Sequence, residues 1–241
     1  MKYGHEAFRL GMELLGGLAK YCLLTTGTAI VRLPEDLPLE VICPASCATA
    51  TIASALENHQ VADRVVLVTG AGLLGLTASA MASMRGAATI IAIDPQAERR
   101  AKALEFGATH AISPEEAPDL IPPVTDGYGA DLGIELSGAA TVFQLLLASQ
   151  RMGGCLTLVG AVFPGDPVSM PMERIVRRNL TLQGIHNYAP RHLQQAVDFL
   201  TTARDRFPFR EVVRHCYPLQ DIKQVVAAAK MSCNVRVGVK S

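Results

Sequence analysis

A glycine-rich turn between two apolar runs is the feature that most constrains the fold of this 241-residue chain. The first run, from Val65 to Val68, is rich in β-branched residues and does not alternate, which is typical of a strand covered on both faces of a parallel sheet. The turn GAGLLG follows with the G-x-G-x-x-G spacing of Gly70, Gly72 and Gly75. These glycines permit a tight turn, a close approach of backbone to a pyrophosphate and close helix–strand packing. A small-residue helix and a second run over 89–93 complete a predicted β-α-β unit.

The helix after this turn is expected to hold a dinucleotide through its backbone. Its first N–H groups, at Leu73 and Leu74, favour an anion together with the helix dipole. Asp94 ends the second apolar run. An acid at that place accepts hydrogen bonds from the ribose diol of NAD and repels the 2′-phosphate of NADP. A tight strand–helix turn that binds no ligand stays open as the alternative.

Composition excludes some classes of partner. The 22 basic and 22 acidic residues cancel, so the chain has no charge footprint for nucleic acid or for an anionic membrane. With 49% hydrophobic and 18% charged residues, it is typical of a compact α/β protein. No apolar run reaches the roughly 18 residues of a membrane span, and no cysteine pair has the C-x-x-C spacing. We therefore expect a cytoplasmic protein with reduced thiols and a small-molecule ligand.

Strands and helices continue to alternate after Asp94. Apolar runs over 109–112, 131–136, 155–160 and 180–185 bring the predicted strands to six, with helices between them. Six strands of this kind form the two mononucleotide-binding halves of a doubly wound parallel sheet. A helix is expected over 44–58, before the first strand. After residue 187 we expect a helix, a strand, a helix and a strand, over 191–204, 212–217, 219–230 and 235–239.

The first 44 residues do not resemble the start of a domain. We expect two short strands there, one after the turn at Gly16 and one over 29–34, and they have no neighbours in the sequence to form a sheet. This segment is therefore expected to pack against the tail after residue 187. We also expect that part of the protein lies upstream of Met1.

The chain resembles the zinc-containing medium-chain alcohol dehydrogenase family from Gly16 onward. The motifs that carry the resemblance are, in the family's order, GGLAKY, PASCATAT, VLVTGAGLLGL, AID, EFGATH, ELSG, LVGAVFPG and VRVGV. GIHNYAPRHL, with KYGHE and PASCATAT, is similar to the branch associated with phosphonate catabolism. The resemblance implies a Rossmann domain for NAD over 47–187, a remnant of a GroES-like catalytic domain over 1–46, and a tail over 188–241 that returns to it. It also implies an N-terminally truncated chain.

The family's mechanism implies zinc as a second cofactor. A catalytic zinc polarises an alcohol oxygen while hydride passes to NAD, and it needs three protein ligands. Cys47 matches a cysteine ligand of the family, and Thr51 matches a residue near the nicotinamide. His5, in a GHE triplet, lies too close to Cys47 to match the family's histidine ligand well. The other ligands should lie upstream, so the zinc site is expected to be incomplete, and a buried thiol remains the alternative for Cys47.

Further candidate residues lie at the ends of the later strands. Ser137 follows the fourth strand, and Val159, Gly160, His186 and Asn187 follow the fifth and sixth, where ligands of such sheets bind. By resemblance, Arg99 holds the adenosine ribose and Arg236 reaches the pyrophosphate. The expected partners are an alcohol or aldehyde and a second copy of the chain in a dimer.

Three functions stay open at this point. One is an NAD-dependent zinc alcohol dehydrogenase, and another is a truncated dinucleotide-binding module without turnover. The third is a zinc-independent reductase that uses NADPH, against which Asp94 and Cys47 both argue.

Overall fold

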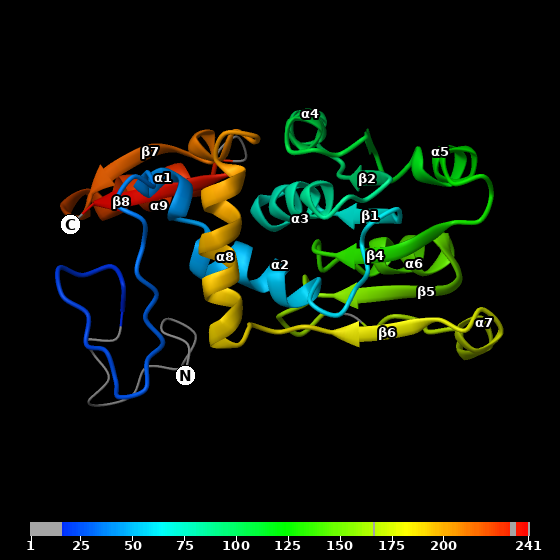
Figure 1. Ribbon diagram of the computed structural model, residues 1–241. Coiled ribbons are helices and arrows are strands. Elements are labelled where there is room, and N and C mark those ends of the chain that lie inside the picture. Colours follow the sequence, from blue (N-terminus) through cyan, green and yellow to red (C-terminus); the bar gives the residue numbers. More distant parts are fainter. Residues whose placement is uncertain (1–15, 166, 232–234, 241) are drawn as a thin grey trace. The chain divides into compact units, whose positions relative to one another are not determined.

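The computed structural model describes residues 16–165, 167–231 and 235–240 (Figure 1). The chain divides into two units. The larger unit is Pro44–Pro208, and the smaller unit combines Met1–Cys43 with Phe209–Ser241. Within the described residues, no helix has the length and apolar character needed to cross a membrane.

The larger unit is built on a six-stranded parallel sheet in the order β3-β2-β1-β4-β5-β6. The strands are β1 (Val65–Thr69), β2 (Thr89–Ile93), β3 (His110–Ile112), β4 (Ala130–Glu135), β5 (Gln150–Leu158) and β6 (Thr181–Gly184). The order reverses between β1 and β4, which is the switch point of a doubly wound sheet. The predicted fold class, a doubly wound sheet of six parallel strands, is confirmed.

Helices cover both faces of this sheet (Figure 1). They are α2 (Ala50–Ala55), α3 (Leu73–Met84), α4 (Ala97–Glu105), α5 (Ala117–Val124), α6 (Ala140–Ser149), α7 (Met172–Arg177) and α8 (Pro190–Ala203), with a π-helix, η1 (Ala45–Thr49), before α2. The face that carries Leu67 and Ile91 packs against α5 and α6 in one core cluster. On the other face α3 lies against β1 and β2, and α2 lies against α3. Buried small residues such as Ala78, Ser79 and Ala82 keep α3 slim enough for this packing.

Two details of the larger unit differ from the sequence prediction. The helix expected over 44–58 is two segments, η1 and α2. Residues 188–208, which the sequence placed in the tail, lie in the larger unit. The reason is that α8 packs against η1 and α2 and buries Ala196, Val197 and Leu200.

The smaller unit contains a two-stranded parallel sheet. Its elements are α1 (Leu39–Ile42), the 3₁₀ turns η2 (Phe209–Glu211) and η3 (Leu219–Asp221), β7 (Val213–Pro218), α9 (Ile222–Ala229) and β8 (Arg236–Lys240). Because α1 contacts η2 and β7, the part of the predicted N-terminal segment that forms α1 does pack against the end of the chain.

The prediction of two strands before residue 35 is wrong. Residues 16–38 form no strand in the described part of the chain, and side chains such as Leu18, Tyr21 and Ile30 are exposed. A strand needs a neighbour for its N–H and C=O groups, and the described residues offer none to this segment.

Candidate functional site

A pocket of about 290 Å³ opens at the carboxyl ends of β1, β2 and β4. It lies at the switch point, where doubly wound sheets bind their ligands. The candidate residues that line it are Gly70, Gly72, Leu73, Leu74, Gly75, Asp94, Arg99 and Ser137. The fold therefore gathers the glycine-rich turn, the acid after β2 and the end of β4 around one cavity.

The three glycines of the turn meet three different steric demands. Gly70 has a φ of +84°, in the left-handed region that favours glycine. A Cβ on Gly75 would lie 1.9 Å from the carbonyl oxygen of Gly70, so α3 approaches the turn too closely for any side chain. A Cβ on Gly72 would meet nothing within 4 Å. Gly72 therefore leaves open space beside the backbone.

The amino terminus of α3 is available to an anion. Gly72 is the residue before the helix, and within the described chain no side chain caps it. The first N–H groups of an α-helix have no partner inside the helix, and the helix dipole adds positive potential there. Leu73, Leu74 and Gly75 supply these groups at the pocket wall. This end of α3 can bind a phosphate through backbone alone.

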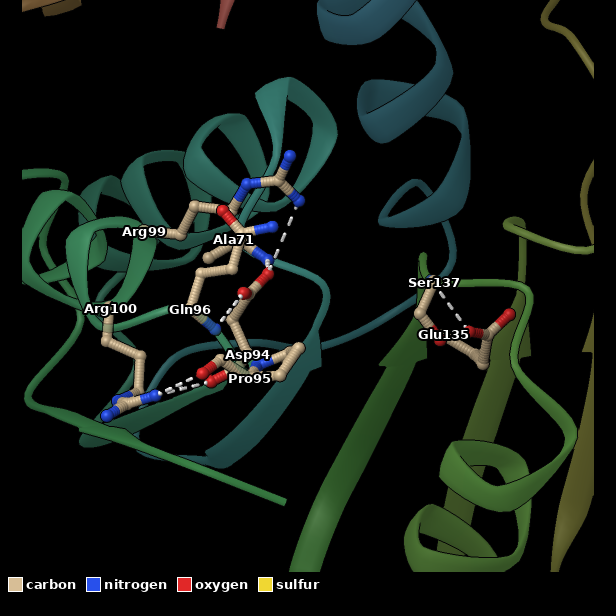
Figure 2. Close-up of polar contacts among 8 residues, drawn as sticks. All are labelled: Ala71, Asp94, Pro95, Gln96, Arg99, Arg100, Glu135 and Ser137. Atoms are coloured by element: carbon tan, nitrogen blue, oxygen red, sulfur yellow. Dashed lines mark hydrogen bonds and ion pairs between the residues drawn. The ribbon is translucent and has the colours of Figure 1, made fainter. Parts of the chain in front are cut away.

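Asp94 connects the turns after β1 and β2 (Figure 2). Its side chain is 2% exposed. Oδ2 accepts a hydrogen bond from the N–H of Ala71 at 2.8 Å, and Oδ1 accepts one from the N–H of Gln96 at 2.9 Å. Each carboxylate oxygen keeps a further lone pair for a ligand hydroxyl. The sequence predicted a ligand role for Asp94 but not this structural one.

Two arginines flank Asp94. Nη1 of Arg99 lies 3.8 Å from Oδ2 of Asp94, and the Arg99 side chain is 38% exposed. Arg100 donates from Nη1 to the backbone carbonyls of Asp94 and Pro95, at 2.9 Å each. Arg99 is thus the arginine with freedom to contact a ligand at the rim, while Arg100 holds the turn.

Glu135 is a buried carboxylate that sequence reasoning missed. Its Oε1 accepts hydrogen bonds from the N–H and hydroxyl of Ser137, at 2.7 and 2.6 Å, and from the N–H of Gly138 at 2.8 Å. The Ser137 hydroxyl proton is therefore already engaged, and its oxygen accepts from the N–H of Ala139 at 3.1 Å. Ser137 borders the pocket chiefly as a piece of ordered backbone. The motif ELSG contained Glu135, so the only sequence signal was its place at a strand end.

Five apolar residues complete the wall of the pocket and were also not predicted. They are Ile93, Pro95, Pro114, Leu136 and Val142. Pro95, Pro114 and Leu136 each come shortly after a strand, the position from which ligand contacts arise in such sheets. Glu135 lines a second pocket, of about 440 Å³, whose other lining residues, such as Phe143, Leu158 and Met170, are apolar.

The remaining strand-end candidates lie farther along the carboxyl edge of the sheet. Val159 and Gly160 follow β5, and their N–H groups both donate to the carbonyl of Glu135 at 3.0 Å. A Cβ on Gly160 would lie 2.5 Å from the backbone nitrogen of Gly138, so the turns after β4 and β5 touch. His186 and Asn187 follow β6, and Asn187 has a φ of +65°. A ligand that crosses the switch point from the pocket would extend toward these four residues.

Cys47 and Thr51 lie on η1 and α2. The hydroxyl of Thr51 donates to the carbonyl of Cys47 at 2.6 Å, and Cys47 is half-buried. The described residues contain no group of three or more His, Cys, Asp or Glu side chains that could hold a metal ion. A catalytic zinc needs three protein ligands, so the described residues do not fit a zinc site. His5 lies outside the described residues, and Arg236 begins β8 in the smaller unit.

Comparison with known proteins places this site in a family. Residues 74–202 match the family model of the zinc-binding dehydrogenases. Geraniol dehydrogenase of Castellaniella defragrans is 30% identical over 207 residues, which are 83% of this chain and 55% of that enzyme. L-threonine 3-dehydrogenase of Symbiobacterium thermophilum is 30% identical over 216 residues, or 88% of this chain and 60% of that enzyme.

A solved alcohol dehydrogenase of Thermotoga maritima has a TM-score of 0.80 and 25% identity, covering 87% of this chain and 60% of that one. The chain thus spans little more than half the length of these relatives. Because the family model covers more than half of its residues, the chain belongs to the zinc-binding dehydrogenase family.

Proposed function

We propose that this chain is the cofactor-binding part of an NAD-dependent oxidoreductase that transfers hydride between an alcohol and NAD. The observation that carries the proposal is the switch-point pocket, in which the amino terminus of α3 and the carboxylate of Asp94 face one cavity. The names of the relatives support it, since geraniol dehydrogenase and L-threonine 3-dehydrogenase are both dehydrogenases of hydroxyl-bearing substrates.

In this proposal each wall of the pocket binds one part of the cofactor. The N–H groups of Leu73, Leu74 and Gly75 hold the pyrophosphate, next to the open space at Gly72. Asp94 accepts from the ribose diol and selects NAD over NADP by its charge, and Arg99 borders the same ribose. Val159, Gly160, His186 and Asn187 hold the nicotinamide end, chiefly through backbone.

Zinc has a separate place in the proposal. Cys47 is the one candidate ligand on the described chain, and no step is assigned to zinc because the described residues lack its other ligands. We propose that those ligands belong to a catalytic domain upstream of Met1, of which the smaller unit is the GroES-like remainder. The limited coverage of geraniol dehydrogenase supports this.

We further propose the setting in which the enzyme works. It is a cytoplasmic homodimer that acts in phosphonate catabolism, with an alcohol or aldehyde as substrate. Support for the phosphonate assignment comes from the resemblance of GIHNYAPRHL to the phosphonate-associated branch. A binding module without turnover is the second candidate, and the lack of a three-ligand metal cluster in the described residues favours it.

One set of measurements separates these functions. NAD and NADP are titrated into the purified chain by calorimetry, bound zinc is measured by mass spectrometry, and NADH formation is followed with a panel of alcohols. NAD binding with zinc and turnover supports the oxidoreductase, and NAD binding without zinc or turnover supports the module. Preference for NADPH would contradict both. The matched control compares Asp94→Asn with Asp126→Asn, an exposed aspartate outside the pocket.

A further inference from the structure

The helical turn that carries Cys47 has a shifted hydrogen-bond register. In η1 the N–H of Thr49 donates to the carbonyl of Pro44 at 3.1 Å, and the N–H of Ala50 donates to the carbonyl of Ala45. In a regular α-helix the N–H of Ala50 would donate to Ser46, four residues earlier. In the π register the N–H of Ala50 therefore donates to Ala45 instead of to Ser46. Single π turns of this kind are frequent at functional sites.

Tyr188 is a partner of the Ser46 carbonyl. Its hydroxyl donates a hydrogen bond to the Ser46 carbonyl, although the two residues are 142 positions apart in the chain. Tyr188 is half-buried and lies between β6 and α8, directly after the candidate residues His186 and Asn187. One phenol thus joins the loop after β6 to the turn that carries Cys47.

The loop is itself fixed to the end of α2 by a second set of contacts. The N–H of Ala189 donates to Nδ1 of His192 at 2.9 Å, and Nε2 of His192 lies 3.1 Å from Oε1 of Glu57. Arg191 donates to both carboxylate oxygens of Glu57 at 2.7 Å. Glu57 follows α2, which continues directly from η1. Tyr188 therefore projects from an anchored loop, and its hydroxyl has little freedom to leave Ser46.

We propose that Tyr188 is a positioning residue that keeps the Cys47 turn in its π register and couples that turn to the loop after β6. Without the phenol, the Ser46 carbonyl is free to accept the N–H of Ala50, as it would in an α-helix. That change gives the turn an α register and redirects the Cys47 side chain. The coupling to a bound nicotinamide rests on the proposed function, whereas the control of Cys47 by Tyr188 does not.

The test measures the reactivity of Cys47 in the full chain. Tyr188→Phe keeps the ring and removes the donor, and Tyr128→Phe is the matched control because Tyr128 is 74% exposed. All proteins carry Cys43→Ser, so that the neighbouring exposed thiol does not compete. Alkylation by iodoacetamide is followed at each cysteine by peptide mass spectrometry. Loss of one hydrogen bond should speed the modification of Cys47 about fivefold in Tyr188→Phe and leave it unchanged in Tyr128→Phe.

Cys155 distinguishes positioning from general loosening. It is half-buried in β5 of the same unit and far along the chain from η1. If Tyr188 acts on the Cys47 turn, Cys155 keeps its wild-type rate, and hydrogen exchange increases at the amides of 45–50 but not in β1. An unchanged rate at Cys47, or an equal acceleration at Cys155, would overturn the proposal.

Adding NAD separates this inference from the proposed function. NAD should slow the alkylation of Cys47 in the wild type, and this protection should fall in Tyr188→Phe. If calorimetry shows NAD binding but NAD has no effect on Cys47 in the wild type, the coupling to the nicotinamide is contradicted. If NAD does not bind, the proposed function is contradicted, while the comparison of variants without NAD still decides the role of Tyr188.

Discussion

Replacing Asp94 by asparagine tests whether this carboxylate both stabilises the fold around the pocket and binds the cofactor. The carboxylate accepts two backbone hydrogen bonds, from Ala71 and Gln96. Asparagine has one carbonyl oxygen, so its NH₂ group must face one of these two N–H donors. A hydrogen bond to a charged group contributes about 1.5–3 kcal/mol, and one such bond is lost. We expect the free energy of unfolding to fall by about 2–3 kcal/mol.

The same substitution weakens cofactor binding. A buried and fully accepting carboxylate is replaced by a group with fewer acceptor sites for the ribose diol, and the turn at Ala71 loses an anchor. We expect about a tenfold rise in the dissociation constant for NAD, which corresponds to about 1.4 kcal/mol. The ratio of NAD to NADP affinity should also fall, because the charge that repels a 2′-phosphate is gone.

Urea unfolding and calorimetric titration measure the two effects separately. Asp126→Asn is the control, and as an exposed surface change it should alter stability by less than about 0.5 kcal/mol. Wild-type stability together with wild-type NAD affinity in Asp94→Asn would refute both roles. Lower stability with unchanged affinity would leave only the structural role.

Three further substitutions test other parts of the structure. Gly75→Ala should destabilise the larger unit in urea unfolding, because its methyl group would lie 1.9 Å from the Gly70 carbonyl oxygen. The expected loss is several kcal/mol, on the order of that caused by an overpacked core substitution. Gly72→Ala meets nothing within 4 Å, so it should keep wild-type stability yet weaken NAD binding in calorimetry, since its methyl enters the open space. Burial, and then the charge of Arg85, lowers the pKa of His59 from 6.5. As the pH drops below 6.5, the unfolded chain therefore binds the His59 proton before the folded chain does, and the free energy of unfolding falls. His59→Gln should make this fall with pH less steep than in the wild type, as measured by urea unfolding at several pH values. An equal slope in both proteins would contradict the assignment.

The sheet was predictable because its signals are local. Buried parallel strands appear as apolar β-branched runs, and Gly70, Gly72 and Gly75 mark where the chain turns into α3. The two expected N-terminal strands failed because pairing is not a local property. Residues 16–38 have strand-like composition, yet a strand forms only where a neighbour accepts its hydrogen bonds. The prediction that α8 belongs to the tail failed for the same reason, since its apolar face meets α2 and η1 only after folding.

The site was predictable to the extent that it follows a motif. Asp94 and the glycine turn were found from spacing alone, and the pocket gathers them. Glu135 was missed because its function is to accept from Ser137 and Gly138, a turn whose geometry no spacing rule encodes. The contact of Tyr188 with Ser46 joins positions far apart in the chain, so it becomes visible only in three dimensions.

Two buried carboxylates, Asp94 and Glu135, order the turns around the pocket without any ligand. Asp94 fixes the turns after β1 and β2, and Glu135 fixes the turn after β4, so the strand ends around the switch point are tied by hydrogen bonds within the protein. A site that is already ordered loses less conformational freedom when it binds. Each carboxylate was brought out of water at a cost that its hydrogen-bond donors offset, so these turns should resist change more than an ordinary surface loop does. Cofactor binding should therefore leave their hydrogen exchange nearly unchanged. The larger response is expected at the Cys47 turn, whose Ser46 carbonyl accepts from the Tyr188 hydroxyl.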